Sequence, residues 1–426
     1  MRQIYTTYKI FVCILFVITT LIIIVSCGGD DEKKIVKKSK DIGNIHFYID
    51  NSASMKGYFG NDAEFKTIIS DLTTKIDKTI KPIDIWFSSG KDEKYPFDAQ
   101  RFSSDIATTI IADRNGFQLY EMIKRIADKN DSCDISILVS DCILSFPDSA
   151  IKKNREINKQ EAPNALKNNI YSTFSDLKRK GFATSIYAFN SKFYDVYYDY
   201  QNTRTKKLKG NKRPFYILVF ADKEILAKFN ANLADITTFK PEKSLLFGLN
   251  EEPVMDYEII PQIERIGKWM KSSKGIKDIE MEKNEPMQFC VSINLENMPE
   301  YTKDVVYLQK NLIIGAAGCK VGFEVKEKGK LDKSKLKSEP QIKLYDKATH
   351  AIIFKVNEMA LSEAKINVSL PLHYDTWYLD WSCMDDKNLS LVEGKTFAFE
   401  HFIAGMKEAY ETKNKNHIDF SITLNK

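Results

Sequence analysis

Three oxygen-bearing side chains stand at alternate positions near the start of the chain: Asp50, Ser52 and Ser54, within the sequence DNSAS. Alternate residues of an extended segment point to the same side, so one carboxylate and two hydroxyls can converge on one point. Oxygen ligands suit a hard divalent cation, with Mg²⁺ first and Mn²⁺ or Ca²⁺ as alternatives. The competing interpretation of the two serines is turn and helix-capping chemistry.

The elements around this segment alternate between strands and helices. Residues 44–50 (NIHFYID) form an apolar strand that leads directly into it, and apolar residues at helical spacing follow from Phe65 to Ile80. This alternation predicts an α/β fold, a doubly wound and mostly parallel sheet with helices on both faces. Such sheets bind ligands beyond the carboxyl ends of their strands, where Asp50 and Asp141 stand. Further strands are expected at residues 83–87, 134–141, 183–189 and 215–220.

Two motifs together resemble a known binding site. DNSAS follows the first apolar strand, and the strand ILVSD ends at Asp141 about ninety residues later. This pair is similar to the metal-ion-dependent adhesion site (MIDAS) of von Willebrand factor A (VWA) domains, and the likeness covers residues 42–235. It implies that Asp50, Ser52, Ser54 and Asp141 bind a divalent cation, most often Mg²⁺. It also implies that an Asp or Glu carboxylate of a partner protein completes the coordination, without any reaction.

Two positions depart from the family's pattern. The family has a threonine in the loop after its third strand, and the candidates here are Thr108, Thr109 or Asp113. Cys142 stands where the family has a glycine after the second aspartate. These departures leave a metal-free form of the domain as an alternative.

The amino terminus has the features of an export signal. Arg2 and Lys9 precede an apolar stretch at residues 10–25, which ends at Ser26-Cys27. This junction resembles the lipobox of bacterial lipoproteins, which implies that residues 1–26 are removed and that Cys27 is lipidated. Residues 27–41 are then a polar tether, and the protein is anchored in the outer membrane, on its surface or periplasmic face. The alternative is an uncleaved signal anchor.

Composition excludes some classes of protein. The formal net charge of +5 falls to +3 when Arg2 and Lys9 leave with the signal, which is too weak to indicate nucleic-acid binding. Apart from Cys27, five cysteines remain in the mature chain, without tight spacing. We therefore expect no disulfide framework, with at most a Cys290–Cys319 pair.

Residues 236–426 change in character and predict a β-rich, sandwich-like domain with one amphipathic helix at 399–410. Strands are expected at 287–295, 311–326, 350–356, 365–373 and 417–424. In the first domain, we interpret the aromatic run at 193–200 as a strand that packs in the core and on the sheet face, with sugar stacking as the alternative. The basic run RTKKLKGNKR at 204–213 is interpreted as a solvated loop. In the second, DTWYLDWSCMDD at 375–386 is interpreted as buried tryptophans beside a solvated turn.

Three functions fit these observations. The favoured one is a lipid-anchored cell-envelope protein that binds a partner protein through the cation and is not an enzyme. An envelope metal-dependent hydrolase is the alternative, but no general base stands beside the site, because both of its aspartates are used by the ion. A metal-free structural subunit of an envelope assembly is the third. The chain contains no HExxH, Walker, GxSxG or CxxC motif.

Overall fold

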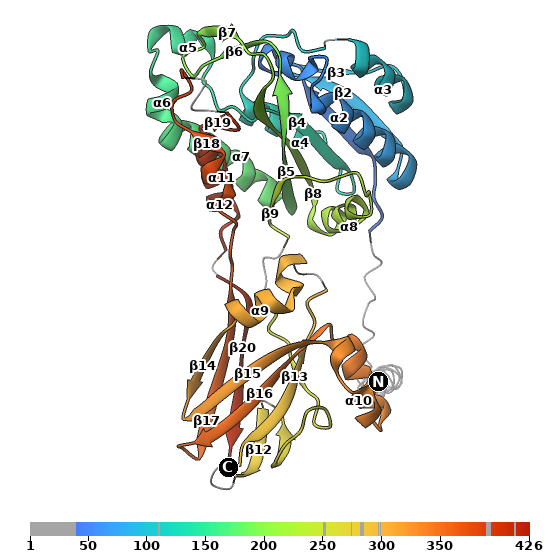
Figure 1. The fold of residues 1–426 in the computed structure, drawn as a ribbon, viewed down its shortest axis with the longest axis vertical. Coiled ribbons are helices and arrows are strands. Elements are labelled where there is room, and N and C mark those ends of the chain that lie inside the picture. Colours follow the sequence, from blue (N-terminus) through green and yellow to red (C-terminus); the bar gives the residue numbers. More distant parts are fainter. Residues whose placement is uncertain are drawn as a thin grey trace, which may run out of the picture. The chain divides into compact units, whose positions relative to one another are not determined.

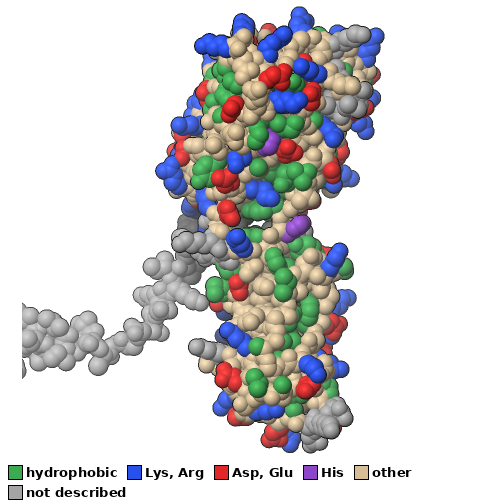
Figure 2. Space-filling model, turned by 90° about the vertical axis from the view of Figure 1, so that its left-hand side faces the viewer, with side chains coloured by type: hydrophobic (Ala, Val, Ile, Leu, Met, Phe, Trp, Pro, Cys, Tyr) green, Lys and Arg blue, Asp and Glu red, His purple; other side chains and the backbone are tan. Residues whose placement is uncertain are grey.

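The computed structural model describes residues 40–426, apart from 110, 250–252, 274, 282–284, 297, 299, 389–392 and 413–414. The predicted signal peptide, Cys27 and nearly all of the predicted tether lie outside the described residues. In the described part of the chain, no helix is long and apolar enough to cross a membrane. On the face drawn in Figure 2, basic and acidic side chains are interspersed over the surface.

A seven-stranded sheet organises the first part of the chain (Figure 1). Its strands, in spatial order, are β3 (Asp92–Lys94), β2 (Ile83–Ser88), β1 (Ile45–Asp50), β4 (Ile135–Ser140), β8 (Asn211–Asp222), β5 (Phe182–Phe193) and β9 (Lys243–Phe247). The predicted α/β class is confirmed. The sheet is mixed, since β2, β1 and β4 are parallel and every other neighbouring pair is antiparallel.

The antiparallel half of the sheet follows from two long apolar strands. β5 and β8 each have 12 residues and pair along their full length, from Phe182 opposite Asp222 to Phe193 opposite Asn211. Residues 213–221 of β8 are all buried, and such a strand is stable only in the interior of a sheet. β8 therefore lies between β4 and β5.

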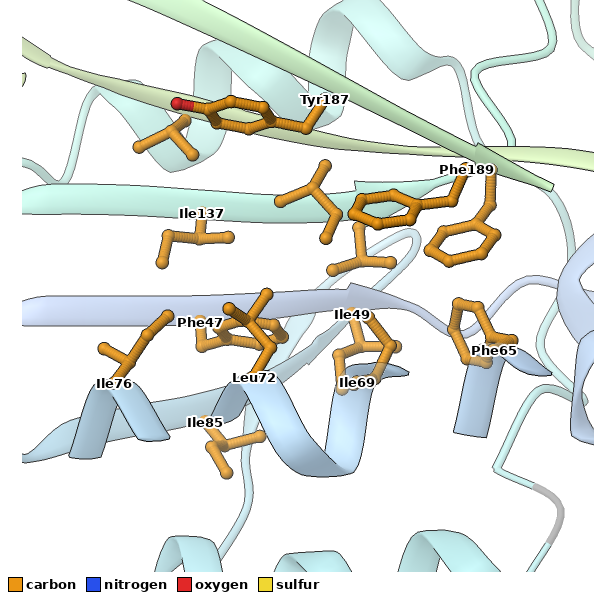
Figure 3. Close-up of a cluster of buried hydrophobic side chains, with 14 of the residues drawn as sticks. Phe47, Ile49, Phe65, Ile69, Leu72, Ile76, Ile85, Ile137, Tyr187 and Phe189 are labelled. Atoms are coloured by element: carbon orange, nitrogen blue, oxygen red, sulfur yellow. The ribbon is translucent and has the colours of Figure 1, made fainter. Parts of the chain in front are cut away.

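Helices cover both faces of this sheet, as predicted (Figure 1). One face carries α2 (Glu64–Lys75), α3 (Ala99–Thr108) and α8 (Lys223–Ala234), and the other carries α4 (Leu119–Ala127) and α7 (Lys167–Arg179). Figure 3 shows Ile69 and Leu72 of α2 close to Ile49 of β1, in a cluster of buried hydrophobic side chains. The alternation of apolar residues in β1 sends Phe47 and Ile49 to this face and Tyr48 to the other.

Segments beyond Asp235 complete the same α/β core. β9 extends the sheet, and the helix α12 (Phe399–Tyr410) packs on α7. Phe399 stacks on Tyr216 of β8 with ring centroids 4.1 Å apart. Gly405 permits the close contact between α12 and α7, because a Cβ at this position would lie 2.6 Å from the carbonyl oxygen of Lys167 in α7. The predicted helix at 399–410 thus forms, but it packs in the α/β core.

The remaining C-terminal residues are rich in strands, as predicted, and form two sheets on one apolar core. Phe289 and Phe354 come from one sheet, and Ile366 and Ile422 come from the other. The first sheet contains β10 (Glu258–Ile259), β13 (Met287–Ile293), β16 (His350–Met359) and β15 (Cys319–Glu327). The second contains β11 (Lys268–Ser272), β12 (Gly275–Glu280), β20 (Asn416–Asn425), β17 (Glu363–Pro371) and β14 (Ile313–Ala317). The five cysteines from Cys133 to Cys383 are free, so Cys290 and Cys319 do not pair.

Candidate functional site

The DNSAS segment begins at the carboxyl end of β1 and folds back at once. Asp50 is 5% exposed, and its Oδ1 accepts a hydrogen bond of 2.9 Å from the backbone N–H of Ser52. Ser52 and Ser54 face each other, with their hydroxyl oxygens 3.0 Å apart. Ser54 lies in the 3-10 helix η1 (Ala53–Phe59). The three positions thus lie close together, but through this helical turn and not along the extended segment that the sequence predicts.

Asp141 joins this group because β4 runs parallel to β1 as its direct neighbour. Ser140, the last residue of β4, donates a 2.9 Å hydrogen bond to Oδ2 of Asp50. Asp141 itself is 6% exposed and accepts hydrogen bonds from the Ser54 hydroxyl and, at 3.3 Å, from the backbone N–H of Ile143. Two carboxylates and two serine hydroxyls thus meet at the carboxyl edge of two parallel strands.

The two buried carboxylates destabilise each other's charge. Burial raises the pKa of Asp50 to about 6, and the nearby charge of Asp141 adds to this rise. Hydrogen bonds from Ser52 and Ser140 act in the opposite direction. Burial also raises the pKa of Asp141, opposed by its hydrogen bond from Ser54. A divalent cation between the two carboxylates would remove this repulsion, and the oxygen donor set fits a hard cation.

These side chains form the floor of an open cleft with a volume of about 550 Å³. The lining also includes Phe146 and Asp148, from the segment after β4, and Tyr198 and Asn202, from a second segment of the chain. Asn202 Nδ2 donates to Asp148 Oδ1 at 2.7 Å, which joins these two segments. No His, Lys, Arg or Cys is among the described residues that line the cleft.

The segment between α3 and α4, called the third loop below, approaches the site through its backbone. Arg114 forms an isolated parallel bridge with Ser52, and its carbonyl oxygen accepts a 2.8 Å hydrogen bond from the N–H of Ala53. The side chains proposed for this loop point elsewhere. Thr108 and Thr109 are exposed at the end of α3, and Asp113 is 76% exposed and pairs with Arg114. None of these three lines the cleft, whereas Asn115 and Gln118 do.

Cys142 has a backbone conformation that glycine would adopt without strain. Its φ is +54°, in the left-handed region that side chains disfavour by about 1–2 kcal/mol. Its thiol is fully buried in the core on the α4 and α7 face, and burial raises its pKa far above the ordinary value. Its N–H donates to the Ser140 hydroxyl at 3.1 Å. The turn after Asp141 thus keeps the geometry that glycine would allow without strain.

One residue of the site and two buried polar residues outside its lining were not identified from the sequence. Ser140 was visible in LVSD, but only the register of β1 against β4 shows that it contacts Asp50. Asn158 is buried beside the cleft, where its amide donates to the carbonyl oxygen of Tyr200 and accepts from the N–H of Phe146. Arg213 is 3% exposed, so its interpretation as part of a solvated loop was wrong. The signal for Arg213 was its place directly before the apolar strand FYILVF.

The predictions for the aromatic run at 193–200, the basic run at 204–213 and the segment 375–386 are confirmed only in part. Residues 204–207 form the strand β7 (Arg204–Lys207), which pairs with β6 (Val196–Tyr198), so they are not a loop. Tyr197 and Tyr200 are buried, as core packing predicts, whereas Tyr198 lines the cleft. In the segment 375–386, Trp377 is buried as predicted, but Trp381 is only half-buried. Asp386 is buried, so its interpretation as part of a solvated turn was wrong.

Among the described residues, no group of three or more His, Cys, Asp or Glu side chains is placed to hold a metal ion. The site described above has two carboxylates and completes its donor set with hydroxyls. No protein-family model matches the chain, and a search of curated proteins gave no match.

Proposed function

We propose that this chain is a lipid-anchored cell-envelope protein that binds a partner protein through a divalent cation, most favourably Mg²⁺. In this proposal the α/β part is a VWA-like domain. Asp50, Ser52, Ser54 and Asp141 hold the cation, and an Asp or Glu carboxylate of the partner completes its coordination. The protein binds its partner without catalysing a reaction.

The observation that carries the proposal is the convergence of the two motifs at the floor of the cleft. Asp50 and Asp141 are separated by about ninety residues, yet the parallel pairing of β1 with β4 brings their carboxylates together. Their burial is costly without a cation. The hydroxyls of Ser52 and Ser54 are neutral donors, so a bound cation would keep affinity for one more carboxylate.

The metal-free structural subunit remains the second candidate, and one observation favours it. Thr108, Thr109 and Asp113 do not line the cleft, so the third loop supplies none of the expected ligands. Ser140 and the backbone N–H groups of Ser52 and Ile143 already satisfy part of the carboxylate oxygens. Cation affinity decides between the two candidates.

The test is a titration of Mg²⁺ and of Mn²⁺ into the mature protein, followed by calorimetry and by the melting temperature. A cation that binds only the folded state raises the melting temperature in proportion to its occupancy. Asp141→Asn should abolish the increase, Ser54→Ala should weaken it, and Asp113→Asn, an exposed matched control, should leave it unchanged. No response of the wild-type protein to millimolar cation would favour the metal-free subunit.

Partner binding is tested in intact envelopes. Chemical cross-linking of the wild-type protein should give an adduct that disappears with EDTA and in Asp141→Asn, but persists in Asp113→Asn. An adduct that forms equally in Asp141→Asn would contradict binding through the cation.

A further inference from the structure

Among the three larger sheets of the described chain, one edge strand has no charged residue. This strand is β14, with the sequence IIGAA, which pairs with β17 alone at the end of its five-stranded sheet (Figure 1). The other edges of these sheets are formed by strands that contain Lys, Asp or Glu: β3, β9, β10, β11 and β15. Charges, Pro residues or a covering helix commonly prevent an edge strand from pairing with another chain. β14 has no charge and no Pro, so it is the edge most open to an added strand.

The edge of β15 shows how the chain closes such a strand. The helix α9 (Val305–Asn311) packs beside β15, and the amide of Gln309 takes the place of a neighbouring strand. Its Oε1 accepts a 2.8 Å hydrogen bond from the N–H of Val325, and its Nε2 donates to the carbonyl oxygen of Phe323 at 3.3 Å. Within the described chain, no side chain bonds to the backbone of β14 in this way.

The pairing of β17 with β20 shows to which side each residue of β17 turns its backbone groups. The N–H of Lys426 donates to the carbonyl oxygen of Ser362 at 2.9 Å, one step beyond the last residue pair of the two strands. Successive residues of a strand turn their backbone groups to opposite sides. Even-numbered residues of β17 therefore bond to β20, and odd-numbered residues bond to β14. The N–H of Asp419 in β20 agrees with this alternation, because it donates to Val254 on the side away from β17.

Two residues of β14 are thus left with backbone groups that point away from the sheet. The odd-numbered residues of β17 pair with Ile313, Gly315 and Ala317, which use their N–H and C=O groups within the sheet. The N–H and C=O groups of Ile314 and Ala316 face outward, and no described strand pairs with them. Ala316 is exposed, and Gly315 has no side chain, so another backbone can approach closely. These outward groups are the ones to which an added strand would bond.

Both ends of β14 are positively charged. Lys310 lies in the last turn of α9, just before the strand, and Lys365 is the partner of Ala317 at its other end. Both lysines are exposed, and neither has an acidic partner among the described residues. A second copy of β14, paired antiparallel about Gly315, would bring Lys310 of one chain next to Lys365 of the other. Like charges oppose such a pair, whereas a segment with an acidic residue at each end would complement both lysines.

We propose that the open edge of β14 binds an extended segment of a partner protein, which adds to the sheet as one further strand. The segment is uncharged in its middle and has an Asp or Glu at each end. Backbone hydrogen bonds to Ile314 and Ala316 hold it, and Lys310 and Lys365 select its charge. This surface uses neither the cleft nor a cation, so the inference goes beyond the proposed function and does not depend on it.

The first experiment measures peptide binding to the mature full-length protein by fluorescence anisotropy, in EDTA so that no cation contributes. The probe is a labelled synthetic peptide of about nine residues, with alternating Val and Thr and an Asp at each end. It should bind saturably, and the same peptide with Lys at each end should bind roughly ten-fold more weakly or worse. Methylation of alternate backbone nitrogens on its pairing side should abolish binding. Absence of saturable binding at millimolar peptide, or equal binding of the acidic and basic peptides, would overturn the proposal.

The second experiment changes the edge itself. Ala316→Pro removes an outward N–H and leaves the bonds between β14 and β17 in place, as edge strands tolerate. It should weaken binding of the acidic peptide roughly ten-fold or more, whereas Ala316→Ser, which keeps the N–H, should bind like the wild type. Circular dichroism and the urea midpoint check that each variant is folded. Undiminished binding by a folded Ala316→Pro variant would contradict the proposal.

A third variant leaves the strand untouched and tests the charge of the partner. The double substitution Lys310→Glu/Lys365→Glu lies at exposed positions and should reverse the preference, so that the basic peptide binds more tightly than the acidic one. An unchanged preference would show that these lysines do not select the segment. Sedimentation of the wild type tests the other occupant: a dimer that Ala316→Pro converts to a monomer would show that a second copy covers this edge, and would overturn the proposal.

Discussion

The substitution Asp50→Asn should make the protein more stable when no cation is present. Asp50 is buried beside Asp141, and its pKa rises from the ordinary 3.8 to about 6. Above that pH the folded state carries a charge that burial and a like-charged neighbour both disfavour. Asparagine keeps the shape of the side chain and its acceptor for the Ser52 N–H, but removes the charge.

The size of the effect follows from the pKa rise. A carboxyl group whose pKa is 3.8 unfolded and about 6 folded lowers stability by about 3 kcal/mol when it is fully ionised. Asparagine turns the hydrogen bond with Ser140 around, because the amide donates and the hydroxyl must accept, at a cost of about 1 kcal/mol. The expected net gain of Asp50→Asn near neutral pH is therefore about 1–2 kcal/mol.

The sign of the pH dependence is also fixed. Because the folded state holds the proton of Asp50 more tightly than the unfolded state, this group lowers stability as the pH rises from about 4 to about 6. Asparagine resembles the protonated acid. The difference in stability between Asp50→Asn and the wild type should therefore be small below about pH 4 and reach its maximum above about pH 6.

Urea unfolding in EDTA at a series of pH values, followed by circular dichroism, measures this difference. Asp113→Asn is the matched control, because that carboxylate is 76% exposed and its removal should change stability by less than about 0.5 kcal/mol at every pH. A variant that is less stable than the wild type near neutral pH, or a difference that does not vary with pH, would refute the reasoning. Excess Mg²⁺ should stabilise the wild type and leave Asp50→Asn unchanged.

Substitutions at four further positions test the surroundings of the site, the α/β core and the anchor. Gly57→Ala should destabilise the protein by about 2 kcal/mol or more in urea unfolding, because its Cβ would lie 2.2 Å from the buried ring of Phe193. Cys142→Gly should change stability by less than about 1 kcal/mol, since relief of the left-handed strain offsets the lost thiol, whereas Cys142→Val should destabilise more strongly. Phe402→Ala in α12 should destabilise the α/β core by about 3–5 kcal/mol. No such effect is expected if residues 42–235 form this core by themselves. Cys27→Ala should move the protein from the membrane fraction to the soluble fraction, and retention in membranes would favour the uncleaved signal anchor.

The sequence predicted where helices and strands lie along the chain better than it predicted which of them pack against each other. Periodicity gave β1, α2, β4 and most strands of the C-terminal part, because each has a regular apolar face. It did not place β8 between β4 and β5, because the sequence of a strand does not show which distant strand it pairs with. It also assigned α12 to the wrong core, because an apolar stripe shows that a helix packs without showing what it packs against.

The candidate site was predictable where its residues are close in sequence or end a strand. Asp50, Ser52 and Ser54 share one turn, and Asp141 ends a strand, so a parallel sheet brings them together. The third loop was not predictable, because its backbone bridges to Ser52 while its threonines point elsewhere. Arg213 was missed because a run of basic residues usually indicates a solvent-exposed segment. The burial of this one side chain depends on Tyr197 and Asp386, which lie about 15 and 170 residues away in the sequence.

Two unfavourable features of the α/β part lie together at one edge of its sheet. Two buried carboxylates repel each other there, and Cys142 holds a left-handed conformation directly after one of them. Asn202, another residue with positive φ, lines the same cleft. The apolar clusters on the two faces of the sheet, by contrast, follow the alternation of their strands. Strain and repulsion persist in a folded protein only where the surrounding structure enforces them, and a functional site is the usual reason. The repulsion at the carboxyl ends of β1 and β4, with the strained turn beside it, is therefore a physical argument for a ligand at this edge, in addition to the likeness of the DNSAS and LVSD motifs.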